Sequence, residues 1–231
     1  SDVCSSDLKK IGYIPGEINL MEEISGIQFI KFMADYRGMK NLGRANELIK
    51  RFELDPRCKI KKMSKGMKQK VGIVIAFMHD PDILILDEPT SGLDPLMQNE
   101  FVNLILEEKR RGKTILMSSH IFEEVEKTCN HVGIIKQGKI VSIEDIDTLR
   151  KSKHKIYAIT FKNIKDIDRF KKENFSIKNI NNNVVEVVIQ NEINELIACL
   201  NNYQIINLDI VNQSLEEIFM HFYGGEVDHV Q

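Results

Sequence analysis

Short apolar runs alternate with amphipathic segments along the first part of the chain. The runs Lys10–Ile14, Ile83–Leu86 and Thr114–Ser118 predict three strands. Ile83–Leu86 is apolar at every position, so we expect a short strand that is buried. Because helical patterns separate these runs, the order indicates βαβ units and a largely parallel sheet.

Helix start and stop signals frame the segments between these strands. Ser25 is a good N-cap for a helix closed by Gly38, and Asp94 and Gly112 frame another helix with proline at its first position. Further helices are expected at Ala45–Phe52, Lys65–His79 and Ile121–Thr128. The helix that follows Ser25 and the helix at Ala45–Phe52 together predict a small helical lobe, about residues 18–62, inserted after the first strand.

The second part of the chain has a different pattern. Val132–Ile135 and Lys139–Ile143 predict a hairpin that turns at Gln137-Gly138. Past about Arg150 the expected order is βαββαβ, with the elements Ile156–Phe161, Asp166–Lys172, Phe175–Ile180, Val184–Ile189, Glu192–Asn201 and Ile205–Val211. This order suggests a small α+β ferredoxin-like unit, followed by a last helix at Leu215–Tyr223.

Apolar residues alternate along the strands of this unit, and we expect their side chains to face its interior. They are Ile156, Ala158, Thr160, Val185, Val187 and Ile189. We therefore predict two domains, residues 9–150 and residues 151–231, the second an accessory domain without catalytic residues.

Composition narrows the class of protein. In 231 residues, 42% are hydrophobic and 29% charged, which is ordinary for a soluble globular protein. The net charge of −2 predicts no general attraction to nucleic acid or to a membrane. The four cysteines are widely spaced without a C-x-x-C, so neither a zinc site nor a disulfide framework is indicated. No apolar stretch is long enough to span a bilayer.

Two adjacent carboxylates, Asp87 and Glu88, follow the second apolar run. The carboxyl end of a parallel strand is where α/β sheets place their ligands. One acid there can hold Mg²⁺ while the other orients or deprotonates an attacking water, which suggests nucleoside-triphosphate hydrolysis. The alternative is an acidic strand-to-helix turn without chemistry.

A helix start upstream suits phosphate. Ser64 can cap the following helix and donate to a phosphate, and Gly66 lets backbone N–H groups approach closely. The lysines around it form a dense basic run, at positions Lys59, Lys61, Lys62, Lys65, Lys68 and Lys70. This run has no interleaved aromatics for base stacking, which favours a solvated face with a local phosphate attraction over a nucleic-acid patch.

Ile83–Pro95 resembles the Walker B motif and D-loop of the ABC ATPase family, and Ser64–Lys70 resembles its signature motif, commonly L-S-G-G-Q. The signature departs from the common form at Met63, Lys65 and Met67. Ile11–Glu17 resembles the Q-loop region, with Gly16 in place of the usual glutamine.

The resemblance implies an α/β P-loop NTPase-like core and a role for each matching residue. Asp87 would serve Mg²⁺, Glu88 would act as general base, and His120, which follows Thr114–Ser119, would be the switch histidine. Glu17 is the candidate substitute for the glutamine that Gly16 replaces. ATP would be contacted by Ser64, Lys65, Gly66, Met67, Gln69 and Asp94.

The family's phosphate-binding loop, G-x-x-x-x-G-K-[ST], does not occur in these 231 residues. In the family it precedes the segment that begins here at Ile11. We therefore expect the chain to be truncated at its N-terminus, with an incomplete sheet. Residues 1–8 fit nothing that follows, and Val3–Leu8 resembles a translated sequencing adapter, so we interpret them as a non-native leader.

Ser214–Gly224 resembles the tail of export-type ABC ATPases that pair with a separate permease chain. The resemblance implies an ATP-hydrolysing subunit that dimerises head to tail with a second ATP-binding subunit, lies at the inner face of the cell membrane through a multi-pass permease, and binds no nucleic acid. Two alternatives stay open: an inactive fragment or non-catalytic binding module, and a soluble non-transport ABC ATPase.

Overall fold

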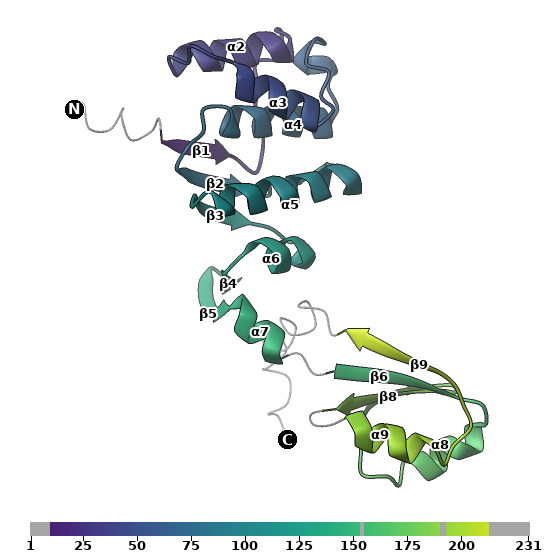
Figure 1. Cartoon of the computed structure of the whole chain (residues 1–231). Helices are drawn as coiled ribbons and strands as arrows, with labels where there is room; N and C mark the ends of the chain where they lie inside the picture. The colour runs from purple at the N-terminus through teal and green to yellow at the C-terminus, as the bar shows by residue number, and fades with distance from the viewer. Residues whose placement is uncertain (1–9, 153–154, 190–192, 213–231) are drawn as a thin grey trace. The chain divides into compact units, whose positions relative to one another are not determined.

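The computed structural model describes residues 10–152, 155–189 and 193–212 (Figure 1). The chain divides into two compact units, Ser1–Thr128 and Cys129–Gln231, and each is described by itself. The expected leader at residues 1–8, the helix Leu215–Tyr223 and the tail Ser214–Gly224 lie outside the described residues. The domain boundary near Arg150 stays a prediction.

A parallel sheet of three strands forms the centre of the first unit. Its order is β1 (Ile11–Ile14), β2 (Ile83–Asp87) and β3 (Thr114–Ser118). Leu86 pairs with Ile14 on one side and with Met117 on the other, so all three strands end at the same edge. The chain segments that follow β1, β2 and β3 are thereby brought together, as expected for parallel strands.

The prediction of a fully buried second strand is wrong in one respect. Leu84 and Leu86 are buried, whereas Ile83 and Ile85 are 39% and 36% exposed. The core formed with the flanking helices lies on the face of Leu84 and Leu86. Among the described residues the other face is uncovered, so an all-apolar strand alternates in burial here.

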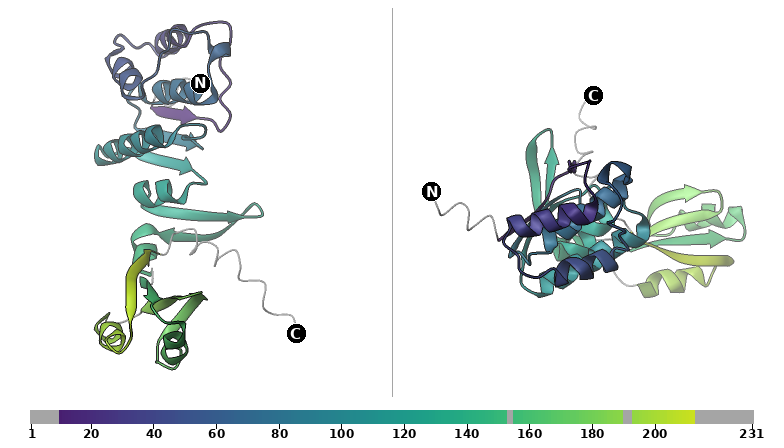
Figure 2. Two further views of the ribbon diagram at one scale, coloured as in Figure 1. Left: turned by 90° about the vertical axis from the view of Figure 1, so that its right-hand side faces the viewer. Right: turned by 90° about the horizontal axis from the view of Figure 1, so that it is seen from above.

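The helical lobe lies between β1 and β2. It contains α2 (Gly26–Tyr36), α3 (Gly43–Arg51) and the short 3₁₀ helix η1 (Ile60–Lys62), and α2 and α3 pack on α4 (Lys65–Phe77) (Figure 1 and Figure 2). Ser25 and Gln28 form a capping box at the start of α2, because each side chain meets the backbone N–H of the other.

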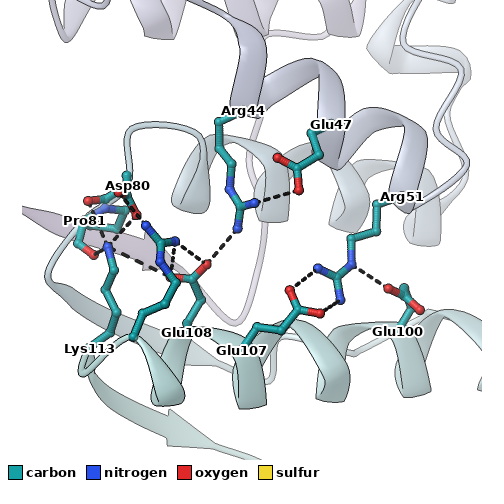
Figure 3. Close-up of polar contacts among 10 residues, drawn as sticks. Arg44, Glu47, Arg51, Asp80, Pro81, Glu100, Glu107, Glu108 and Lys113 are labelled. Carbon is teal, nitrogen blue, oxygen red and sulfur yellow. Dashed lines mark hydrogen bonds and ion pairs between the residues drawn. The ribbon is translucent and has the colours of Figure 1, made fainter.

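Ion pairs tie this lobe to α5 (Pro95–Arg110), the helix between β2 and β3 (Figure 3). Arg51 donates to both carboxylate oxygens of Glu107, at 2.6 and 2.9 Å, and its Nε donates to Glu100. Arg44 donates to the buried Glu108 at 2.7 Å. These contacts attach α3 to α5 through charge-assisted hydrogen bonds in addition to apolar packing.

The second unit begins with the predicted hairpin. β4 (His131–Lys136) pairs antiparallel with β5 (Lys139–Asp145), and Gln137 and Gly138 both have positive φ at the turn. Two such residues match the twist of the flanking strands, which explains the Gln-Gly pair. The helix α7 (Ile146–Ser152) follows.

A separate four-stranded antiparallel sheet follows α7, and its strand order is β7-β8-β6-β9. Two helices cover one of its faces around an apolar cluster. In chain order the elements are β6 (Lys155–Phe161), α8 (Ile164–Phe170), β7 (Ser176–Asn181), β8 (Val184–Ile189), α9 (Ile193–Leu200) and β9 (Ile205–Asn212). The predicted βαββαβ order is therefore observed, in a sheet distinct from that of β2.

The predicted positions are confirmed on β8, where Val185 and Val187 are buried, but on β6 the helices cover the other set of residues. Val185 pairs with Ile159 and Val187 pairs with Tyr157, so the cluster under the helices takes the odd-numbered residues of β6. Ala158 and Thr160 lie on the opposite face, opposite Glu186 and Val184. Both parities of β6 are apolar, and only the cross-strand register decides which one meets the helices.

Candidate functional site

The turn after β2 places the two adjacent acids at the carboxyl edge of the sheet. The Ser118 hydroxyl donates to Asp87 Oδ1, and the Glu88 N–H donates to Ser118 Oγ at 3.1 Å and to the Ser118 carbonyl at 3.3 Å. Glu88 has φ +45°, a left-handed conformation that is unfavourable for a residue with a side chain. The bonds to Ser118 hold this conformation and direct the two carboxyl groups.

His120 reaches the same place from the segment after β3. Its Nδ1 lies 2.6 Å from Glu88 Oε2. The His120 side chain is 73% exposed and that of Glu88 is 32% exposed, so the pair is open to solvent and to a ligand. Asp87, Glu88 and His120, predicted separately as site residues, are thus brought together.

Gly16 lies against the first acid. A Cβ built on Gly16 would be 2.7 Å from Asp87 Oδ2, so a side chain there would have to displace that carboxylate. The departure from the family's glutamine therefore matches the position of Asp87. Glu17 is exposed, and its role as a substitute stays a prediction.

Ser64 begins α4 as predicted. Its hydroxyl accepts the Met67 N–H at 3.2 Å, while Ser64 and Lys65 are exposed. Lys65 Nζ donates to Ser91 Oγ at 2.8 Å. The exposed start of α4 therefore presents a hydroxyl and backbone N–H groups, a combination suited to an anion.

The start of α4 and the turn after β2 touch through two glycines. A Cβ on Gly66 would lie 2.6 Å from the Gly92 carbonyl oxygen, and Gly92 has φ +80°. Gly66 thus permits a close backbone approach between two segments that are far apart in the sequence, which is a packing role in addition to the predicted one.

Gln69 is buried, and its amide Nε2 donates to the Pro89 carbonyl at 2.7 Å and to the Glu88 carbonyl at 3.4 Å. Asp94 accepts the Met97 N–H at 3.0 Å and so caps α5. Both residues were predicted to contact ATP. The structure gives each a hydrogen bond that shapes the site, and their contact with ATP stays a prediction.

Glu124, on α6 (Phe122–Thr128), is a residue of this region that sequence reasoning missed. Its buried carboxyl accepts from Thr90 Oγ1 at 3.0 Å and from Ser119 Oγ at 3.1 Å. Burial raises the pKa of Glu124, although these two hydrogen bonds act in the opposite direction. One carboxyl therefore joins the turn that carries Glu88 to the segment that carries His120.

The oxygen donors at this edge fit Mg²⁺ in kind. The cation takes one or two carboxylates and completes its shell with water and substrate phosphates, and Asp87 and Ser118 offer a carboxylate and a hydroxyl. Across residues 10–152, 155–189 and 193–212, no three His, Cys, Asp or Glu side chains gather as a metal site.

Two lysines of the basic run are paired with acids. Lys61 Nζ lies 3.0 Å from Glu23, and Lys68 Nζ lies 3.0 Å from Glu22. These pairs fit the expectation of a solvated face better than that of a nucleic-acid patch.

Comparison with known proteins adds to this geometry. A family model described as "AAA domain, putative AbiEii toxin, Type IV TA system" matches residues 36–126. An uncharacterized ABC transporter ATP-binding protein of Nostoc sp. is 31% identical over 221 residues, 92% of this chain and 65% of the relative. The bacitracin transport ATP-binding protein BcrA of Bacillus licheniformis is 34% identical over 172 residues, 71% of this chain and 56% of the relative.

A solved structure described as the ATP binding subunit of an ABC transporter is 32% identical, with a TM-score of 0.59 over 65% of each chain. The chain spans about half to two thirds of the length of the curated relatives it matches. These likenesses agree with the parallel sheet of the first unit. The chain belongs to the family of ABC transporter ATP-binding proteins and has the α/β fold of an ABC ATPase, with a parallel sheet and additional antiparallel sheets.

Proposed function

We propose that this chain is part of an ATP-hydrolysing subunit that drives export through a separate membrane permease. The observation that carries the proposal is the meeting of Asp87, Glu88 and His120 at one sheet edge, with the start of α4 held against the same turn by Gln69. Residues from three separate segments, namely the turn after β2, the segment Ser118–His120 and α4, converge there, which an acidic turn without chemistry does not require.

Each residue at the carboxyl edge of the parallel sheet would have its own role in ATP hydrolysis. Mg²⁺, when bound with ATP, supplies charge neutralisation for the phosphates. Asp87 holds its side of the cation, with the carboxylate oriented by Ser118. Glu88 accepts the proton of the attacking water, and His120 positions the Glu88 carboxylate through the 2.6 Å contact. Ser64 and the N–H groups after it contact phosphate oxygens.

The exposed start of α4 supports a dimer. Ser64 and Lys65 are open to solvent, so a second ATP-binding subunit could present its nucleotide to them, head to tail. None of the helices described in this chain has the length and apolarity needed to cross a membrane. We place the subunit at the inner face of the cell membrane, held there by a multi-pass permease.

The 231 residues contain no G-x-x-x-x-G-K-[ST], and this favours a second candidate, a non-catalytic binding module. That loop supplies most phosphate contacts in P-loop proteins, so we expect the 231-residue chain to bind ATP weakly. Titration with a fluorescent ATP analogue measures this. Tight, saturable, Mg²⁺-dependent binding would show a phosphate site elsewhere in the chain.

Glu88→Gln tests the catalytic proposal in a form of the protein that carries a phosphate-binding loop. The amide keeps the size and a hydrogen-bonding group but cannot accept the proton, so turnover should fall at least about 10²-fold while ATP binding persists. Glu53→Gln, at an exposed acid of the helical lobe to which no role is assigned, is the matched control. Turnover of the Glu88→Gln protein within a few-fold of the parent would exclude Glu88 as the base.

We propose a regulatory or dimer-stabilising role for residues 151–231, in which no predicted catalytic residue falls. The ferredoxin-like order of its strands supports a separately folded unit. A dimeric form that ends near Arg150 should keep basal ATPase activity. Loss of activity in a stable, dimeric form of this kind would contradict a non-catalytic role.

A further inference from the structure

The two edges of the four-stranded sheet differ. β7, at one edge, carries Lys178 and has an irregular register between Ile177 and Asn179. A lysine and a bulge are common protections against pairing with another chain. β9, at the other edge, is eight residues long, contains no lysine, and its one charged side chain is Asp209. Only β7 has the usual protection.

β9 also exposes apolar side chains. Ile206, Leu208 and Ile210 are 63%, 38% and 61% exposed. They alternate along the strand, and Leu208 and Ile210 pair with the buried Ile159 and Tyr157 of β6. The apolar surface therefore continues from the cluster under the helices to this edge of the sheet, where no further strand among the described residues pairs with β9.

The backbone at the centre of β9 is not fully used by the sheet. The Leu208 N–H donates to Asn207 Oδ1 at 3.0 Å, a side chain of its own strand. An N–H that faced β6 would bond a carbonyl there, so this group points to the free edge. It is available to a strand that displaces the asparagine side chain.

The sequence of β9 is complementary to itself in one antiparallel register. When Leu208 lies opposite Leu208 of a second copy, Ile206 faces Ile210 and Ile205 faces Val211. Asn207 then faces Asp209, to which it already donates a hydrogen bond at 2.8 Å within one strand. Centring the pair on Asp209 would instead place two carboxylates together, which is unfavourable.

We propose that β9 is a self-association edge, at which two copies of this chain pair antiparallel about Leu208 and join their sheets into one. The occupant is a second copy because apolar positions meet apolar positions, and the amide meets the carboxylate, along the whole strand. A strand pair buries less surface than a standard protein–protein interface, so we expect a weak dimer. The fraction of dimer should therefore rise over an accessible range of protein concentration. This inference does not rest on ATP hydrolysis.

Sedimentation of the 231-residue chain without nucleotide, over a wide concentration range, tests the proposal. The parent should approach twice the mass of one chain. Leu208→Lys and Ile210→Lys should each raise the dimer dissociation constant at least about tenfold, because a charge would enter the pairing surface. Ile164→Lys, at a residue 68% exposed on α8, should behave as the parent.

Cross-linking gives a second measurement. In a background whose four native cysteines are replaced, Leu208→Cys should form a disulfide-linked dimer on oxidation, because facing Cα atoms in a strand pair lie within disulfide reach. Ile164→Cys should not. A monomer at every concentration, a dimer unaffected by both lysine variants, or association that appears only with ATP would overturn the proposal. So would dimerisation only after removal of residues 213–231, since the edge would then be taken by the chain's own tail.

Discussion

Gln69 Nε2 donates a hydrogen bond of 2.7 Å to the carbonyl oxygen of Pro89, and both groups are buried. This bond joins the first turns of α4 to the turn that carries the acid pair. Because a proline carbonyl in a buried turn has few other donors, the Gln69 amide determines how the turn is held. The relationship leads to a direct test of stability.

Gln69→Leu should lower the free energy of unfolding by about 1–3 kcal/mol, because the Pro89 carbonyl would be left buried without a donor. Urea unfolding measures the loss. Asn103→Leu, at an exposed position of α5, is the control and should change stability little. Equal effects of the two substitutions would mean that the buried hydrogen bond contributes nothing.

Gly66→Ala should destabilise the protein, although alanine in a helix is normally favoured over glycine by roughly 0.5–1 kcal/mol. The new Cβ would meet the Gly92 carbonyl, part of the backbone, at 2.6 Å. Gly72→Ala in the same helix meets only the end of the Ile18 side chain, which can move. We expect opposite signs for the two variants in thermal unfolding. A stabilised Gly66→Ala protein would show that the close approach is not required.

Glu124 should make stability depend on pH. Burial raises its pKa in the folded state, so the folded protein binds the proton more tightly and stability falls as pH rises from the ordinary glutamate value toward the raised one. The Glu124→Gln protein has no carboxyl group to titrate at this position, so it should not lose stability in this way. Its free energy of unfolding, compared with that of the parent protein, should rise between the ordinary and the raised pKa.

Glu123→Gln is the control for Glu124, one residue away. Lys127 lowers the pKa of the exposed Glu123, so its contribution is present above the ordinary pKa and is lost as pH falls. The two glutamine variants should therefore show opposite pH slopes in urea unfolding measured from acid to neutral pH. Parallel slopes would contradict the assignment for Glu124.

The pair Arg51–Glu107 should show measurable coupling in a double-mutant cycle of alanine substitutions. The Arg51 side chain is 15% exposed and binds both carboxylate oxygens, so we expect about 1 kcal/mol or more. Arg57–Asp55, with side chains 85% and 59% exposed, should give a clearly smaller coupling, because solvent screens exposed charges. Coupling of the same size in both pairs would mean that Arg51 does not fasten α3 to α5.

Local signals predicted much of the fold. The caps Ser25, Ser64 and Asp94 begin helices as expected, and β3 has the predicted bounds, Thr114–Ser118. Capping bonds and apolar periodicity act over a few residues, so they can be identified without knowledge of the tertiary structure.

Contacts between distant segments could not be predicted in the same way. The burial of Gln69 and Glu124 depends on partners 20 and 34 residues away, Pro89 and Thr90, so neither polar residue looked like part of the interior. Likewise, every residue of Ile83–Leu86 is apolar, so the pattern could not show which strand face the helices would leave uncovered. These features follow from tertiary packing, which overrides local pattern.

Ser118 has one hydroxyl hydrogen, and the structure directs it to Asp87. The oxygen is then oriented to accept from the Glu88 N–H. A cation that binds to Asp87 would change the orientation of the Ser118 hydroxyl and, through it, the hydrogen bond to the Glu88 N–H. Losing that hydroxyl, as in Ser118→Ala, would release the side chain of one acid and the backbone of the other at once, so defects at the two positions should not add independently.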